Sequence, residues 1–163
     1  MSREKITQEQ VKSILHYEEG ELYWKDENGN KGEKVPIDYV DKDSYKRITI
    51  DGIRYRQHRV IFLYHHGYLP KQVDHEDENK TNNLISNLRD ATNAQNSWNT
   101  GKISTNSSGY KGVYFDKKTK KWRGQVKCNE KKYSTKRYDT IEEAVKEIMQ
   151  LREQLHGEFA NHG

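Results

Sequence analysis

The chain has 163 residues, of which 31% are hydrophobic and 33% are charged, and its formal net charge at pH 7 is +4. This length fits one compact domain or two small modules, and the composition argues against a single large hydrophobic core. With 11 Tyr and 3 Trp, the chain is too aromatic for a disordered protein. We therefore expect small ordered modules.

The sequence also limits the compartment and the cofactor classes. No apolar run is long enough to span a membrane, and the amino-terminal residues lack the apolar stretch of a signal peptide. Cys128 is the single cysteine, which excludes a disulfide framework and a cysteine-cluster zinc site. We expect a cytoplasmic protein that does not associate with membranes and has no structural zinc.

Positive charge is concentrated between Gly109 and Arg137, where the chain has 11 Lys or Arg residues and 2 acidic residues. The rest of the chain has 18 basic and 23 acidic residues. A basic block joined to a mildly acidic body is typical of a module that binds a polyanion, and an ordinary solvated surface is the alternative. The density of the block favours nucleic acid.

Short elements are predicted for the amino-terminal part. Thr7 to Gln10 reads as a capping box. Asp51-Gly52 lies between two alternating segments and predicts a type I′ turn, and Gly67 is a typical helix end. The expected elements are a helix over 7–16, a strand over 21–24 after a turn, a hairpin over 45–58 and a helix over 58–66.

The stretch from Val73 to Asn99 contains the candidate catalytic residues. We expect a strand ending at Asp74 and His75, a polar loop over 76–83 and a second short strand over 87–89. A third capping box, Thr92 to Gln95, predicts a helix that carries Asn96 and Asn99 on one side. A strand pair packed on a helix could bring Asp74, His75 and Asn96 together.

These groups match metal-assisted hydrolysis of a phosphodiester. A carboxylate and an amide carbonyl, from Asp74 and Asn96, favour one Mg²⁺ or Mn²⁺ ion. An imidazole has an unperturbed pKa of about 6.5, so His75 would be largely neutral at pH 7 and could deprotonate water. Taken alone, an Asp-His pair is more often part of a turn, and the asparagines 82, 83 and 93 read as loop or capping groups.

The carboxy-terminal part reads as a separate sheet and helix. Residues 101–109 are small and polar and predict a linker. Strands are expected over 111–116, 121–129 and 131–138. Thr140 to Glu143 reads as a capping box before a helix that ends near Gly157. The apolar residues of that helix form one stripe, comprising Ile141, Ala144, Val145, Ile148, Leu151 and Leu155.

Strand periodicity separates the residues of 121–128 into two faces. One face, with Trp122, Gly124, Val126 and Cys128, can pack on the helix. The other face offers donors to phosphates and base edges, and it comprises Lys121, Arg123, Gln125 and Lys127. A solvated antiparallel face is the alternative. Continuity with Lys111, Lys132, Lys136 and Arg137 favours binding.

The segment DHEDENKTNNLISNLRDATNAQN, residues 74–96, resembles the HNH nuclease motif of phage and intron-encoded homing endonucleases. The preceding HRVIFLYHHGYLP is similar to the helix that leads into this motif. The resemblance covers roughly residues 45–100 and implies a ββα-metal fold. It implies that Asp74 and Asn96 bind the metal, that His75 is the general base, and that Asn87 braces the loop and helps to set His75.

The segment from Ser108 to Ala160 is similar to the AP2 DNA-binding domain, in which a three-stranded sheet packs on one helix. Tyr110, Gly112, Trp122 and the Tyr138-Asp139-Thr140 corner carry much of the likeness. In that family the sheet enters the major groove, which implies DNA contacts from Lys111, Tyr114, Arg123, Gln125 and Lys136. Thr135-Lys136 replaces the usual Leu-Gly pair, which bears on the geometry of the third strand.

The sequence as a whole predicts an α+β protein with two modules. Residues 1–100 would be an HNH nuclease whose motif covers about 58–100, residues 101–109 a linker and residues 110–163 an AP2-like module. The expected activity is site-specific hydrolysis of double-stranded DNA, with nicking favoured, in a phage or mobile-element protein that needs no protein partner. Alternatives are a DNA-binding regulator with a relic site and a nuclease for RNA or branched DNA.

Overall fold

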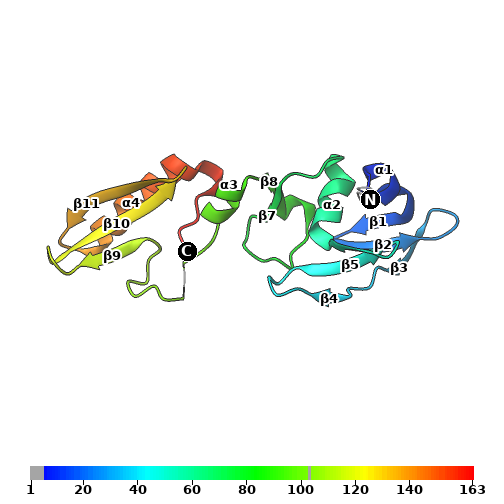
Figure 1. The fold of residues 1–163 in the computed structure, drawn as a ribbon, viewed down its shortest axis with the longest axis horizontal. Helices are drawn as coiled ribbons and strands as arrows, with labels where there is room; N and C mark the ends of the chain where they lie inside the picture. Colours follow the sequence, from blue (N-terminus) through cyan, green and yellow to red (C-terminus); the bar gives the residue numbers. More distant parts are fainter. Residues whose placement is uncertain (1–5, 103) are drawn as a thin grey trace. The chain divides into compact units, whose positions relative to one another are not determined.

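The structure is a computed structural model that describes residues 6–102 and 104–163 (Figure 1). The chain divides into two compact units, Met1–Ala91 and Thr92–Gly163, and each is described by itself. Its strands form small sheets with antiparallel pairing. The protein therefore has a mixed α and β fold with small antiparallel sheets.

The first unit begins with α1 (Gln8–Ile14), and the predicted capping box at Thr7 is confirmed. The helix was expected to continue to about His16, which is wrong. Leu15 is extended and buried, and it pairs with Trp24. It therefore starts β1 (Leu15–Glu18), which the sequence analysis missed, and β1 pairs with β2 (Glu21–Lys25). β3 (Lys31–Lys34) completes this sheet.

The predicted hairpin is confirmed as β5 (Lys46–Ile50) and β6 (Ile53–Arg56), joined at Asp51 and Gly52 with φ of 49° and 73°. A short strand, β4 (Tyr39–Val40), extends the sheet beside β5. The next helix, α2 (Gln57–His66), ends at Gly67, whose φ of 78° is left-handed as expected. The chain then forms β7 (Gln72–His75), a 3-10 turn η1 (Ile85–Asn87) and β8 (Leu88–Ala91).

One hydrophobic core joins these elements within the first unit. Phe62 and Ile61 of α2 are almost fully buried, and Val73 of β7 and Leu88 of β8 belong to the same cluster. The cluster also includes Val11, Leu15, Leu22, Val35, Ile48, Ile50, Val60 and Leu63. The strand pair β7–β8 is thus packed on α2, and this packing fixes the backbone at Asp74 and His75.

The second unit begins with α3 (Asn93–Trp98), whose predicted capping box at Thr92 is confirmed. A sheet of order β11-β10-β9 follows, built from β9 (Val113–Asp116), β10 (Lys121–Cys128) and β11 (Lys131–Tyr138). Helix α4 (Ile141–His156) packs its predicted apolar stripe on β10, and a 3-10 turn, η2 (Gly157–Phe159), follows it. Gly124 allows this close approach, since a Cβ there would lie 2.7 Å from Ile148 Cβ.

Two local expectations for the second unit need correction. The Thr140 side chain does not cap α4 through the backbone; instead its hydroxyl donates to Glu143 Oε2 at 2.6 Å. The segment expected to be a linker makes hydrogen bonds within the unit. Asn106 Nδ2 donates to Tyr110 O at 2.8 Å, and Lys102 Nζ donates to Gly109 O at 3.0 Å. The compact division falls earlier, after Ala91.

Thr135 decides the geometry of the third strand. The pairing of β10 with β11 shifts between Arg123 and Gln125, so a β-bulge lies opposite Gly124. The buried Thr135 hydroxyl accepts a hydrogen bond from the Gly124 N–H at 2.8 Å and donates to Lys136 O at 2.7 Å. The side chain thereby replaces a ladder bond that the bulge interrupts.

In the part of the chain that the structure describes, no helix has the length and apolar character needed for a transmembrane span.

Candidate active site

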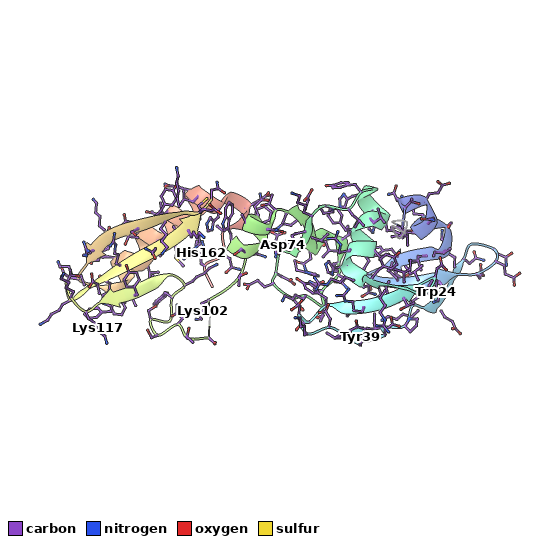
Figure 2. The ribbon with its side chains drawn as sticks, in the orientation of Figure 1. Trp24, Tyr39, Asp74, Lys102, Lys117 and His162 are labelled. Atoms are coloured by element: carbon purple, nitrogen blue, oxygen red, sulfur yellow. The ribbon has the colours of Figure 1, made fainter. Side chains whose placement is uncertain are left out.

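Asp74 and His75 are the last two residues of β7, which pairs with β8. Figure 2 labels Asp74. Both side chains are buried, and Asp74 lies opposite Arg89 in the register. Arg89 Nε donates to Asp74 Oδ2 at 2.9 Å, so the carboxylate is held by a charge-assisted hydrogen bond. Neighbouring residues of a strand point to opposite faces, so Asp74 and His75 present their groups to different surroundings.

His75 is held by an amide that the sequence analysis did not select. Its Nε2 lies 3.0 Å from Asn83 Oδ1, and both residues are only 3% exposed. Asn83 Nδ2 in turn donates to Gln57 Oε1 at 2.9 Å, and Gln57 Nε2 donates to Glu21 Oε2 at 3.1 Å. Asn83 was expected to be a loop or capping group. It is a buried link between the imidazole and α2.

The His75 ring also lies in a small aromatic cluster. The His58 ring meets it edge to face with centroids 5.0 Å apart, and the Tyr45 ring lies 5.9 Å away. Burial lowers the pKa of His75, although the hydrogen bond to Asn83 and the carboxylates of Asp77 and Asp74 act in the opposite direction. Burial, and then the positive charge that His75 can carry, lower the pKa of His58 to about 2. Both imidazoles are therefore neutral at pH 7.

Asn87 holds the loop that follows His75. Its Oδ1 accepts from the Asp77 N–H at 3.0 Å, and its Nδ2 donates to Asp77 Oδ1 at 2.8 Å and to Asn82 O at 2.9 Å. Burial raises the pKa of Asp77, but the hydrogen bonds from Asn82 and Asn87 outweigh that effect, and the pKa is lowered. These contacts agree with the predicted loop brace. The amide that bonds His75 directly is that of Asn83.

Asn96, the remaining expected metal ligand, lies in α3 of the second unit and is half-buried. The structure thus brings Asp74, His75 and Asn87 together in the first unit and places Asn96 in the other. Neighbouring Asn99 is buried, and its carbonyl oxygen accepts from Asn161 Nδ2 at 2.7 Å, which gives it a structural role. Among the described residues, no three or more His, Cys, Asp or Glu side chains form a group that could hold a metal ion.

Comparison with known proteins fits this geometry. A family profile described as HNH endonuclease matches residues 55–98, the range that contains Asp74, His75, Asn87 and Asn96. The chain is also 36% identical over 107 residues to Protein 3.8 of Escherichia phage T7, a match that covers 64% of this chain and 88% of that protein. The chain belongs to the HNH endonuclease family.

This HNH endonuclease is also similar to a protein of a giant virus and to a solved structure. The Uncharacterized HNH endonuclease L560 of Acanthamoeba polyphaga mimivirus is 36% identical over 125 residues, or 75% of this chain and 64% of that protein. A solved structure described as DNA binding and cleavage by the HNH homing endonuclease I-HmuI is 34% identical. That match has a TM-score of 0.36 and covers 45% of this chain and 43% of the other.

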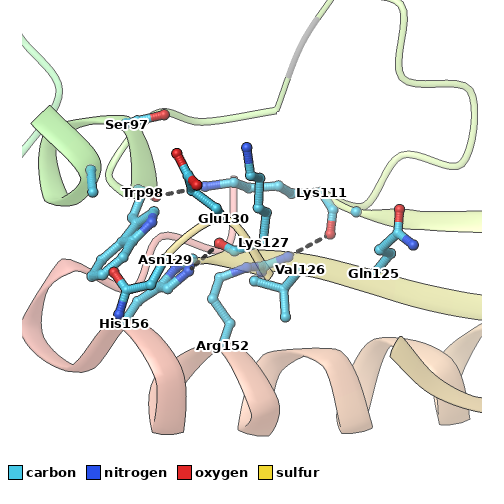
Figure 3. A pocket seen from close by; sticks show the side chains of 12 residues that line it. Ser97, Trp98, Lys111, Gln125, Val126, Lys127, Asn129, Glu130, Arg152 and His156 are labelled. Carbon is cyan, nitrogen blue, oxygen red and sulfur yellow. Dashed lines mark hydrogen bonds between the residues drawn. The ribbon is translucent and has the colours of Figure 1, made fainter. Parts of the chain in front are cut away.

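The second unit of the HNH endonuclease contains a cavity of about 530 Å³ lined by α3, β10 and α4 (Figure 3). Trp98 and His156 stack in it with centroids 4.5 Å apart. Arg152 Nη2 donates to Lys111 O at 2.7 Å, and His156 Nε2 lies 3.0 Å from Lys127 O. These polar groups hold the second unit together.

The face of the second sheet turned away from α4 carries many of the expected DNA contacts. We call it the basic sheet face, and it comprises Tyr114, Lys121, Arg123, Gln125, Lys127 and Arg137. The register places Arg123 between Tyr114 and Arg137 in one row across the three strands. Its buried Nε has no hydrogen-bond partner among the described residues. Lys136 is exposed at the bulge beside this face.

Some of these charges already have partners within the second unit. Lys121 Nζ lies 3.0 Å from Asp139 Oδ1, and Arg137 Nε lies 3.4 Å from Asp116 Oδ2. Both are exposed pairs of the kind that contributes little to stability. Lys111 differs, because its ammonium donates to the carbonyl oxygens of Trp98, Thr100 and Asn161. Lys111 was expected to contact DNA, but it braces the unit internally, so we leave it out of the basic sheet face.

Sequence reasoning missed Glu21, Gln57 and Asn83, which together hold His75. The signal that could have found two of them is burial of an amide. Gln57 falls on the inner side of a helix whose other buried residues are apolar, and Asn83 precedes the apolar Leu84 and Ile85. A buried amide needs partners for both of its ends, so it marks a polar network.

Proposed function

We propose that this HNH endonuclease hydrolyses phosphodiester bonds of duplex DNA with His75 as the general base. The observation that carries the proposal is the buried His75 imidazole, whose Nε2 lies 3.0 Å from Asn83 Oδ1 and whose pKa is lowered by burial, so that the ring is neutral at pH 7. A neutral imidazole can take a proton from the attacking water, and a positioned base contributes about 10² to 10⁴ in rate. The resemblance to homing endonucleases adds that the products carry 5′-phosphate and 3′-hydroxyl ends.

HNH nucleases generally use a divalent metal, and we propose one Mg²⁺ or Mn²⁺ ion bound by Asp74 and Asn96. A carboxylate and an amide carbonyl are the hard oxygen donors that these ions favour, so the donor chemistry fits. When bound, such a cation supplies stabilisation of the negative charge that develops on the phosphate and the leaving oxygen. Arg89 orients the Asp74 carboxylate through its hydrogen bond.

We also propose that the second unit is an AP2-like reader that places the nuclease on its site. Its support is the arrangement of a three-stranded antiparallel sheet with one helix on one face and the basic sheet face on the other. Arg123 and Arg137 lie in one row and can reach neighbouring phosphates or guanine edges. A single active site would nick the duplex, so nicking is the expected outcome of one encounter.

The test is cleavage of supercoiled plasmid that carries the native genomic neighbourhood, with Mg²⁺, Mn²⁺ or EDTA. We expect metal-dependent conversion to open circles, loss of at least about 100-fold in rate for His75→Ala, and DNA affinity within about twofold of the native protein. The matched control is His66→Ala, which removes an exposed histidine of α2. A gel shift that survives EDTA without cleavage would instead support a DNA-binding regulator with a relic site.

A second arm of the test concerns the substrate. A linear DNA duplex, an RNA and a four-way DNA junction, all at the same concentration, compete for cleavage in the same reaction. Preference for the duplex supports the proposal. Preference for RNA or for the junction would overturn the duplex assignment while leaving His75 as the base.

A further inference from the structure

The hydrogen bonds that lead to His75 form a continuous chain through three elements of the first unit. Glu21 lies in β2, Gln57 begins α2 and Asn83 lies in the loop before η1. The bonds are 3.1 Å from Gln57 to Glu21, 2.9 Å from Asn83 to Gln57 and 3.0 Å between Asn83 and His75. Gln57, Asn83 and His75 are each at most 3% exposed, so water does not compete for these bonds.

The chemistry of the groups fixes the direction of the whole chain. An ionised carboxylate can only accept hydrogen bonds, so Gln57 must turn its amino group towards Glu21. Its carbonyl oxygen then faces Asn83 and requires the Asn83 amino group. That leaves the Asn83 carbonyl oxygen for His75, and an acceptor there requires a hydrogen on His75 Nε2. Each amide transmits the constraint because its two ends differ.

Lys46 anchors the far end of the chain. Its Nζ donates to Glu21 Oε1 at 2.9 Å, the oxygen that Gln57 does not use. Burial raises the pKa of Glu21, but the hydrogen bonds from Lys46 and Gln57 outweigh it and lower the pKa. Glu21 is therefore ionised at pH 7 and accepts only.

We propose that Glu21, Gln57 and Asn83 are positioning residues that hold the neutral His75 ring with its proton on Nε2 and its lone pair on Nδ1. The use of that lone pair on water rests on the proposed function, whereas the placement of the proton does not. The bond at Nε2 also fixes rotation of the ring, so Nδ1 keeps one direction. Fixing both the tautomer and the orientation of a histidine base is the task that a carboxylate performs in serine hydrolases.

The direct test is nitrogen-15 NMR of the metal-free, DNA-free protein at about pH 8, where a histidine ring is neutral. Nitrogen–proton correlation spectra of the His75 ring distinguish the two tautomers. We expect a single Nε2–H form in the native protein, with that proton protected from exchange with solvent. An Nδ1–H form, or a rapidly exchanging mixture, would overturn the proposal even if the enzyme cleaves DNA normally.

Variants link the placement of the proton to catalysis. Asn83→Leu removes the acceptor, and we expect kcat to fall about 10- to 100-fold, a part of what a positioned base contributes, with KM for DNA within about twofold. Asn83→Gln keeps an amide with both the acceptor for His75 and the donor for Gln57, and it should recover part of kcat. An Asn83→Leu protein that folds and keeps its kcat, or an Asn83→Gln protein no better than it, would refute the positioning role.

The far end of the chain has its own matched pair. Glu21→Gln replaces the acceptor-only group with an amide that can also donate, so the chain can reverse and the His75 spectrum should show both tautomers. Lys46→Gln removes the shorter of the two lysine ion pairs of Glu21 but leaves the carboxylate for Gln57, so it should keep the native spectrum. Equal spectra for the two variants would refute the transmitted constraint. Absence of cleavage by native protein would refute the proposed function alone, because the spectra need no activity.

Discussion

Asn87→Ala measures how firmly the loop after His75 is held. The substitution removes two donated hydrogen bonds and one accepted bond, which join Asn87 to Asp77 and to Asn82 O. Each intramolecular hydrogen bond contributes about 0.5–1.5 kcal/mol, and a buried group left without a partner costs more. Since Asn87 is only 9% exposed, we expect the free energy of unfolding of the first unit to fall by about 2–4 kcal/mol.

The assay is urea denaturation of the whole chain, with Trp24 as the fluorescent reporter of the first unit in a protein whose other tryptophans are replaced by phenylalanine. The matched control is Asn82→Ala at a half-buried position, which removes a side-chain bond of 2.7 Å to Asp77 Oδ2 and a long bond of 3.4 Å from the Leu84 N–H. It should lower the free energy of unfolding by under about 1 kcal/mol. Equal losses for the two variants, or a loss below about 0.5 kcal/mol for Asn87→Ala, would refute the loop-brace reasoning.

Three other outcomes follow from the structure. Because burial lowers the pKa of His75, its neutral form persists to lower pH than that of a free histidine. We therefore expect kcat to rise with pH, with a midpoint below about 6.5, and to stay level from pH 7 upwards. A midpoint above about 7 in the pH–rate profile would contradict this expectation. If the basic sheet face binds phosphates, replacing Arg123 and Arg137 by Gln should reduce the slope of log affinity against log salt concentration by about 1.8. Fluorescence titrations of DNA at several salt concentrations measure this slope. An unchanged slope would show that the two arginines do not contact phosphates. Gly124→Ala should lower the free energy of unfolding of the second unit by about 1–3 kcal/mol, because the added Cβ would lie 2.7 Å from Ile148 Cβ. Urea denaturation followed by Trp122 fluorescence measures this loss. An unchanged free energy of unfolding would show that α4 can move away from β10.

Local sequence patterns predicted the elements of the fold well where the determining residues are neighbours in the chain. The Asp51-Gly52 turn needs two residues with positive φ, and both have it. The apolar stripe of α4 and the alternation of β10 depend on helix and strand periods alone. The first helix was extended too far because Leu15 suits a helix by propensity, yet its burial and its pairing with Trp24 place it in a strand.

The candidate site was harder to predict because its polar partners come from distant segments. Asn83 and Asn87 look alike in the sequence, because each is followed directly by a leucine. They differ in what surrounds them: Asn83 meets Gln57, which lies 26 positions earlier, while Asn87 bonds within its own loop. Lys111 shows the same limit, since a lysine in a basic block reads as a surface charge until its carbonyl partners are known.

The register of the second sheet has a consequence for how this unit responds to salt. Arg123 lies directly opposite Arg137, and Lys127 lies directly opposite Lys132, so like charges face each other across β10 and β11. Such pairs weaken a sheet. Added ions screen this repulsion and also weaken attachment to a polyanion. Folding and the proposed DNA binding should therefore have opposite ionic-strength dependences. If DNA binds to this face, it should raise the melting temperature most in dilute buffer, where the repulsion that it relieves is greatest.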